Sequence, residues 1–265
     1  MAGPTTAERG ADEDLDSGPL RRRRLRAPRA LIALATALAL LAGAVVWALY
    51  GSSWLRAERV SVSGTRVLTE AQVREAAEVS LGEPLISVDL DAIESRLLKK
   101  LPRIDSVEVI RSWPRGIGLK VSERTPVLIV EDAKNSGKYV EVDAKGMRFA
   151  TVSRAPEGVP LLELTPARSG SSAASLRRFG ESRLVREAVR VAGAIPAAVA
   201  RDTLVVKVRS YDSISLELTG GRTVAWGSAE KGRAKVRALT ALMKAAPDAG
   251  HFDVSVPIAP ASSAS

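Results

Sequence analysis

The sequence predicts an α+β protein with a single N-terminal transmembrane helix, a β-α-α-β-β domain, and a mixed β-sheet domain with helices. Three observations predict this organisation. Residues 30–50 are apolar and uncharged, residues 56–124 carry one strand, two amphipathic helices and two further strands, and residues 125–258 are rich in alternating strand patterns. We expect residues 1–29 to be a disordered basic tail and residues 259–265 to be a short tail.

Composition excludes several classes of function. The chain has 265 residues, of which 46% are hydrophobic and 26% charged, as in a protein that buries a core. The net charge of +9 is largely local, because a cluster of arginines at residues 21–29 carries no acidic residue. Aromatic residues make up 4% and do not interleave with these arginines, which argues against nucleic-acid binding. The absence of cysteine excludes disulfides, thiolate chemistry and cysteine metal sites.

The apolar stretch at residues 30–50 is long enough to cross a membrane. About 20 uncharged residues, rising about 1.5 Å each in a helix, match a hydrocarbon core of roughly 30 Å. The arginine cluster precedes the stretch and its other flank is balanced in charge, so we expect a cytoplasmic N-terminus and a type II orientation in the cell membrane. Trp47, Tyr50 and Trp54 cluster at the outer end, where amphipathic rings prefer the headgroup region.

A cleaved signal peptide is the alternative interpretation of this stretch. Ala42, Gly43 and Ala44 form a small-residue site of the kind at which signal peptides are cut. The apolar run continues beyond that site to Leu49, which is more than a signal peptide needs and enough for an anchor. We therefore expect the segment to remain uncleaved.

Residues 56–124 show the pattern of a small sheet covered by two helices. A short strand ends at Gly64, and Thr69 with Gln72 forms a capping box that predicts a helix starting at Glu70. Gly82 and Pro84 are expected to end this helix. A second helix, capped by an aspartate, places four apolar side chains on one face: Leu90, Ile93, Leu97 and Leu101. Two alternating strands follow, joined by a turn at residues 114–116.

The second domain, residues 125–258, is expected to alternate strands with two helices. Turn residues at 143–146 and 220–221 predict hairpins, and residues 168–175 predict a loop. The helices carry apolar stripes, one with Leu184, Ala188 and Val191 and the other with Val236, Leu239 and Met243. The last pattern, "HFDVSVP" at residues 251–257, predicts a final strand at the edge of the sheet.

No catalytic set emerges from the sequence. Ser228 and Lys231 fit the S-x-x-K motif of penicillin-binding proteins, but the accompanying S-D-N-like and K-T-G elements do not occur, so we interpret Ser228 as a helix cap and Lys231 as solvated. His251 is the only histidine, which excludes a histidine pair. Asn135 begins "NSGKY", which lacks the spacing of a phosphate loop. We expect no catalytic residue, metal site, cofactor or small-molecule substrate.

The order of elements behind one anchor resembles a known family. "VSVSGTRVLT" and "SWPRGIGLKVSERTPV" resemble a POTRA domain, in the version found in the bacterial cell-division family FtsQ, also called DivIB; Gly64, the Trp113–Pro114 turn and the exit at residues 123–127 carry the match. Farther on, "TVAWGS" and "HFDVSVP" resemble the β domain of the same family. We read the matching glycine, prolines and exit as structural rather than as contacts. Similarity is weak between residues 154 and 175.

The resemblance implies a noncatalytic assembly role. Proteins of this family join FtsB-like and FtsL-like single-pass division proteins at the septum, and help recruit and regulate the septal peptidoglycan synthesis machinery. Two alternatives come from other classes: a secreted or anchored cell-envelope enzyme with an unrecognised site, and an outer-membrane translocation component. The second needs a membrane barrel, for which no set of ten-residue strands remains.

The resemblance also implies a partner-binding site on the last strand, where an FtsB-like protein adds its own strand. An open edge offers unpaired backbone groups, and here Asp253 is the only charged residue that would discourage another strand from pairing with it. The candidate partner-binding residues are Phe252, Asp253, Val254, Ser255, Val256 and Pro257, with Phe252 or its outward neighbours giving specificity. The alternative is that the chain covers this strand internally and the partner binds elsewhere.

Overall fold

The computed structural model describes residues 27–165, 178 and 180–264. Most of the expected N-terminal tail, and the loop expected at residues 168–175, therefore lie outside the described residues. The chain divides into two compact units, residues 1–52 and 53–265. The first contains helix α1 (Ala27–Tyr50), long and apolar enough to cross a membrane. At the end of the helix, the Trp47 carbonyl accepts hydrogen bonds from the amides of Gly51 and Ser52.

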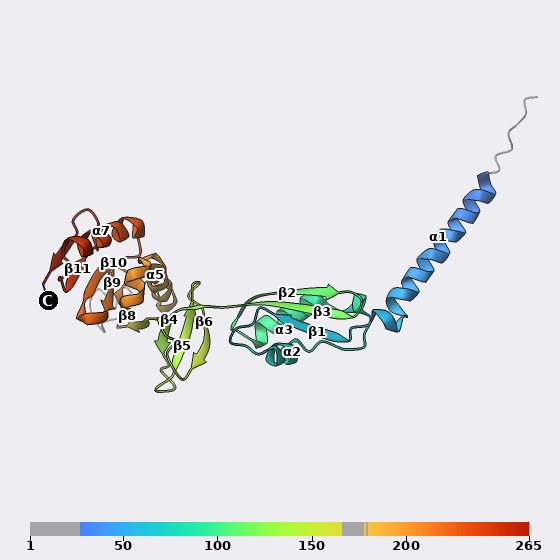
Figure 1. The fold of residues 1–265 in the computed structure, drawn as a ribbon, viewed down its shortest axis with the longest axis horizontal. Coiled ribbons are helices and arrows are strands. Elements are labelled where there is room, and N and C mark those ends of the chain that lie inside the picture. Colours follow the sequence, from blue (N-terminus) through green and yellow to red (C-terminus); the bar gives the residue numbers. More distant parts are fainter. Residues whose placement is uncertain (1–26, 166–177, 179, 265) are drawn as a thin grey trace, which may run out of the picture. The chain divides into compact units, whose positions relative to one another are not determined.

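The second unit begins with the expected strand, two helices and two strands (Figure 1). The elements are β1 (Arg59–Ser63), α2 (Glu70–Ala77), α3 (Leu90–Lys100), β2 (Ile104–Ser112) and β3 (Gly116–Glu123), with short 3₁₀ turns at Ser53–Leu55 and Leu85–Ser87. The sheet order is β1-β3-β2, with β1 parallel and β2 antiparallel to β3. One face of this sheet packs against the helices, and the other carries mostly polar side chains, with Ile110 46% exposed among them.

The local signals read from the sequence act as expected in this domain. The Thr69 hydroxyl accepts a hydrogen bond from the Gln72 amide at 3.2 Å, and the Gln72 side chain accepts one from the Thr69 amide at 2.9 Å. Helix α2 ends earlier than Gly82, because Glu78 adopts a left-handed conformation that closes it. Leu97 is fully buried beneath α3, while the first and last leucines of its stripe are half-buried.

The exit motif at residues 123–127 is structural, as the sequence indicated. The Glu123 carboxylate accepts hydrogen bonds from the backbone amides of residues 66–68, and so holds the loop after β1. Arg124 pairs with Asp105 at 2.9 Å and with Asp143 at 2.5 Å. At Gly64 (φ +85°), a Cβ would lie 2.1 Å from a backbone oxygen of β3, so only glycine fits.

The remaining strands form one nine-stranded sheet in the order β12-β11-β10-β9-β8-β7-β4-β5-β6. The strands are β4 (Pro126–Glu131), β5 (Tyr139–Asp143), β6 (Arg148–Val152), β7 (Leu161–Leu164), β8 (Thr203–Ser210), β9 (Ser213–Leu218), β10 (Thr223–Gly227), β11 (His251–Asp253) and β12 (Ala261–Ser263). The helices are α5 (Glu181–Ala194), α6 (Ala197–Asp202) and α7 (Gly232–Ala245), with a 3₁₀ turn at Thr219–Gly221. Both expected hairpins form, whereas β7 and β12 were not expected.

The core of this sheet lies beneath α5 and α7. All three apolar residues expected on the first helix, Leu184, Ala188 and Val191, are buried. On α7 only Leu239 of the expected stripe is fully buried, and Lys235, one turn before it, occupies the neighbouring core position. The face that helices cover therefore includes one lysine.

Candidate partner-binding edge

Strand β11 lies between two strands and is not at the edge of its sheet. It runs parallel to β10, with Phe252 opposite Val224, and antiparallel to β12, with Phe252 opposite Ser262. The expectation of an open terminal strand is therefore wrong, and so is the expectation that residues 259–265 form only a tail. The reason is the loop between Val256 and Pro260, which reverses the chain and returns it beside β11.

The expected strand is also shorter than its alternating pattern, because β11 ends at Asp253. The Val254 amide donates to the Ala225 carbonyl of β10 at 2.9 Å, so this N–H faces the sheet interior rather than the outer edge. Phe252 and Val254 are fully buried. Phe252 is therefore not available to give partner specificity at the surface, because its ring fills the core beneath α7.

The remaining expected residues lie near the surface. Asp253, Ser255 and Pro257 are half-buried, and Val256 is 52% exposed. The Asp253 carboxylate accepts hydrogen bonds from the Ser255 hydroxyl at 2.6 Å and from its amide at 2.9 Å. These bonds, the hydroxyl first, hold the pKa of Asp253 below its usual range. The acid that we expected to guard the edge instead closes the turn after β11.

An apolar groove adjoins this turn and was not foreseen from the sequence. It has a volume of about 530 Å³ and lies between α7 and the segment that joins β11 to β12. Its floor and walls are Ala234, Ala238, Val256, Pro257, Ile258 and Pro260, and its cations are Lys231 and Arg237. Ile258 is 93% exposed, so a large aliphatic side chain stands in solvent at the groove.

Lys235 ties the start of α7 to the end of β10. Its ammonium donates to the carbonyl oxygens of Trp226 at 2.8 Å and Ser228 at 2.7 Å, and burial lowers the pKa of Lys235. Gly227, between these carbonyls, has φ +78°, and a Cβ there would lie 3.0 Å from Ser255. The lysine therefore holds the turn at the end of β10, and this turn lies next to Ser255 in the segment that follows β11. Lys235 lies four residues before Leu239 and therefore on the same face of the helix, and this spacing was the signal in the sequence that the lysine could be buried.

The S-x-x-K match does not describe a reactive pair. Helix α7 starts at Gly232 with Lys231 as its N-cap residue, and Ser228 makes no capping bond to it, contrary to our expectation. Instead, the Ser228 hydroxyl accepts a bond from the Glu230 amide at 3.4 Å. Lys231 is exposed, as expected.

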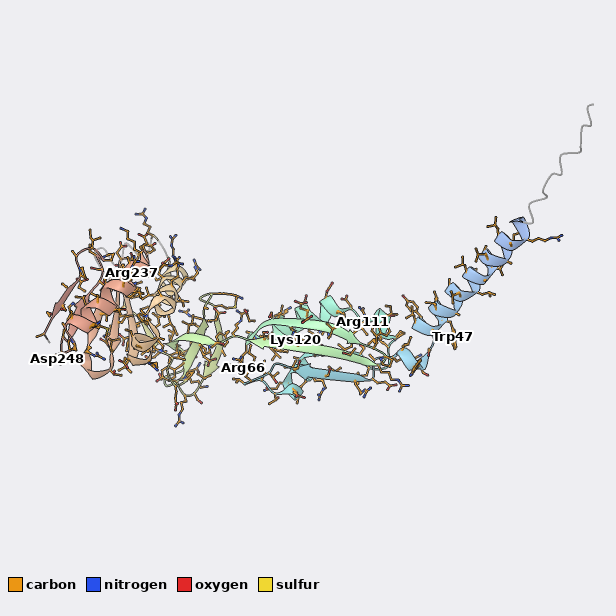
Figure 2. The ribbon with its side chains drawn as sticks, turned by 45° about the horizontal axis from the view of Figure 1, so that its top comes forward. Trp47, Arg66, Arg111, Lys120, Arg237 and Asp248 are labelled. Atoms are coloured by element: carbon orange, nitrogen blue, oxygen red, sulfur yellow. The ribbon has the colours of Figure 1, made fainter. Side chains whose placement is uncertain are left out.

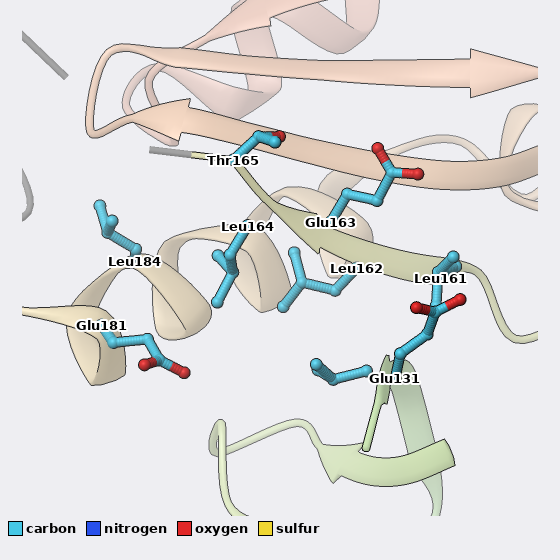
Figure 3. Close-up of a pocket in the computed structure, with 9 residues that line it drawn as sticks. Glu131, Leu161, Leu162, Glu163, Leu164, Thr165, Glu181 and Leu184 are labelled. Atoms are coloured by element: carbon cyan, nitrogen blue, oxygen red, sulfur yellow. The ribbon is translucent and has the colours of Figure 1, made fainter. Parts of the chain in front are cut away.

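A second hollow, of about 430 Å³, lies among β4, β7 and the start of α5 (Figure 3). Two of its four leucines, Leu162 and Leu164, lie on the side of β7 opposite to Glu163 (Figure 3). Glu163 pairs with Lys207 at 3.5 Å, and Glu181 pairs with Arg148. These carboxylates are thus held by separate cations. In the part of the chain that the structure describes, no cluster of three His, Asp or Glu side chains could hold a metal ion.

Comparison with known proteins first defines the class of the outer region. The family model of the FtsQ-type POTRA domain matches residues 55–124, which contain β1 to β3, α2 and α3. The chain is therefore a POTRA-domain protein with an N-terminal apolar helix and a further mixed-sheet domain.

The relatives narrow this class to one family. The chain is 70% identical to cell division protein FtsQ of Streptomyces coelicolor over the full length of both. It is 57% identical to FtsQ of Streptomyces venezuelae, covering 100% of this chain and 99% of that protein, and 30% identical to FtsQ of Mycolicibacterium smegmatis, covering 85% of this chain and 62% of that protein. This chain belongs to the FtsQ family of cell-division proteins, which are noncatalytic components of the divisome.

Solved structures are also similar to this chain. One of them is the major extracytoplasmic domain of the trans isomer of the division protein DivIB from Geobacillus stearothermophilus, matched over 47% of this chain and 94% of that chain. The sequences are 18% identical and the TM-score is 0.30, which is too low for the overlay to bear on the fold.

Proposed function

We propose that this protein is a single-pass type II membrane protein at the division septum, with its POTRA and mixed-sheet domains outside the cytoplasm. There it binds FtsB-like and FtsL-like proteins and helps recruit and regulate septal peptidoglycan synthesis. The arginines before α1 favour this orientation, and membership of the FtsQ family supports the assembly role.

The observation that carries the partner assignment is that one side of β11 pairs only with the short strand β12. Because the Val254 amide faces β10, alternation along the strand directs the backbone groups of His251 and Asp253 toward the other side, where β12 lies. An FtsB-like strand that pairs with β11 would take the place of β12, and its flanking residues would reach the apolar groove beside Val256 and Ile258.

Strand β12 is weakly held in that place. It has three residues, all exposed, and they are alanine and serines that bury little apolar surface. Each ladder hydrogen bond contributes about 0.5–1.5 kcal/mol net. Ordering each residue costs about 1–2 kcal/mol of conformational entropy, which cancels most of that gain. A partner strand that replaced β12 would therefore give up little of the stability of the sheet.

Photocrosslinking tests this assignment in the intact protein. A photoreactive residue at Val256, beside β11, should crosslink to the FtsB-like protein of the same organism. The matched control is Thr151, an exposed residue on β6, the strand at the opposite edge of the same sheet. Crosslinks from the control position alone, or from neither position, would contradict the proposed edge.

Removal of β12 gives a second test. A chain ending at Ile258 should bind the FtsB-like protein at least as tightly as the full chain, because the competing strand is gone. Loss of binding would mean that the partner pairs with β12 itself or requires it. Val254→Pro is a poor test, since it would break the bond to Ala225 inside the sheet.

A further inference from the structure

The end of the POTRA domain at which the chain enters carries three exposed large apolar side chains. Trp54 is 63% exposed, Leu81 is 61% exposed and Trp113 is 51% exposed. They come from the entry segment, from the loop after α2 and from the β2–β3 hairpin. Large aromatic and aliphatic side chains gathered at one end of a small domain indicate an interaction surface.

Backbone hydrogen bonds hold these three segments together. The Ala57 amide donates to the Glu83 carbonyl at 2.9 Å, and the Gly82 amide donates to the Ala57 carbonyl at 2.8 Å. The amides of Glu58 and Arg59 both donate to the Arg115 carbonyl, at 2.9 and 3.2 Å. The entry segment therefore lies between the loop that bears Leu81 and the hairpin that bears Trp113.

Arg111 fixes the same end of the domain from the helix side. Its guanidinium donates to the carbonyl oxygens of Leu85, Ile86 and Val88, at 2.9, 3.2 and 2.7 Å. Figure 2 shows Arg111 at this end of the POTRA sheet and Arg66 at the other. The surface is thus part of the folded domain rather than a loose linker.

The charges around this surface are mixed with a positive excess. Arg56, Arg59 and Arg115 are the cations, and Glu58 and Glu83 are the acids. The Arg115 guanidinium pairs with Glu58 at 3.2 Å, and that of Arg56 donates to the Gly82 carbonyl at 3.0 Å. Tryptophan with arginine is the combination that suits the headgroup layer of a bilayer, where rings lie at the interface and cations meet phosphates.

The short connection between α1 and the POTRA domain indicates that the bilayer is what this surface contacts. The end of α1 at Tyr50 and the hydrogen-bonded Glu58 are eight residues apart, and even a fully extended chain of that length spans no more than about 28 Å. Trp54 is only four residues from Tyr50. If α1 crosses the membrane, this end of the domain cannot move far from the lipid surface.

We propose that this end of the POTRA domain, whose joined segments carry Trp54, Leu81 and Trp113, docks onto the headgroup layer of the membrane that α1 crosses. This inference rests on the proposed anchor. Docking limits the tilt of the domain over the membrane. The ligand is the lipid interface itself, and no protein partner is required.

Site-directed spin labelling of the full chain in nanodiscs of phosphatidylcholine and phosphatidylglycerol tests this inference. The chain contains no cysteine, so each label reports one position. Ser112→Cys places a label beside Trp113, and Ser63→Cys places one at the opposite end of the same polar sheet face, where both serines are exposed. The probes are the accessibilities to oxygen, which concentrates in lipid, and to a water-soluble nickel chelate.

The oxygen-to-nickel accessibility ratio should be about twofold or more higher for Ser112→Cys than for Ser63→Cys, and Trp113→Ser should remove the difference. Equal ratios at the two ends, or a difference unaffected by Trp113→Ser, would overturn the docking inference. A label at Leu41, midway along α1, separates this failure from that of the anchor. Lipid exposure at Leu41 with equal ratios at the serines refutes docking alone, whereas water exposure at Leu41 refutes the anchor and docking together.

Discussion

Replacing Lys235 with methionine should destabilise the second domain without changing its fold. The substitution keeps an unbranched side chain in the core position but removes the ammonium that bridges the carbonyls of Trp226 and Ser228. Each buried carbonyl that loses its donor costs about 1–3 kcal/mol. Methionine is one heavy atom shorter than lysine and adds no apolar group, but its neutral side chain avoids the cost of burying a charge, the same cost by which burial lowers the pKa of Lys235. We expect a net loss of about 2 kcal/mol.

Urea and thermal unfolding of residues 53–265, followed by near-ultraviolet circular dichroism, measure this loss. In a domain of this size, about 2 kcal/mol lowers the Tm by roughly 4–8 °C. Lys231→Met is the matched control: it removes the same charge from an exposed position four residues earlier, and should change stability by no more than about 0.5 kcal/mol. Equal free energies of unfolding for the wild type and Lys235→Met would refute the assigned role of this lysine.

Three further predictions concern topology and stability. A reporter active only outside the cytoplasm should be active when fused at residue 60 and at residue 265; silence at both would exclude the type II orientation, and a mature N-terminus near Val45 would exclude the anchor. Residues 53–265 should be soluble and unfold cooperatively, and Leu97→Asp should cost several kcal/mol, because Leu97 is fully buried; an equally stable variant would show that this core is misassigned. Burial alone raises the pKa of Asp143, but bonds from the Met147 and Lys145 amides and from Arg124 outweigh it, so the pKa is lowered. The stabilisation by this carboxylate is therefore present above the unfolded-state value of about 3.9 and is lost as pH falls through the lower folded value; Arg124→Gln should reduce that acid sensitivity, and an unchanged pH profile of Tm would contradict it.

Most elements of the POTRA domain could be read from short stretches of sequence because their signals are local. The capping box of α2, the aspartate cap of α3 and the alternation in β2 and β3 each act within a few residues. The end of α2 could not be read in this way. It depends on Glu78, whose side chain pairs with Lys100 at 2.5 Å on a separate helix.

The candidate edge was only partly predictable. The alternation in "HFDVSVP" predicted a strand, and β11 forms there. The pattern did not show where the strand ends, because the Asp253 carboxylate turns the chain by bonding to Ser255. In α7, the spacing of Lys235 from Leu239 placed the lysine on the buried side, but a lysine in an amphipathic helix is ordinarily solvated, so it was not predicted as a core residue.

Residue type and spacing were enough to identify the apolar helix, the order of elements in the first outer domain and the family resemblance. These follow from residue type and spacing, which act over one or two turns of chain. The strand that lies at the end of the large sheet could be identified only from the three-dimensional arrangement of the chain. Ala261, Ser262 and Ser263 have no strand pattern of their own, and they become β12 because β11 presents a row of backbone groups that the returning chain can pair with.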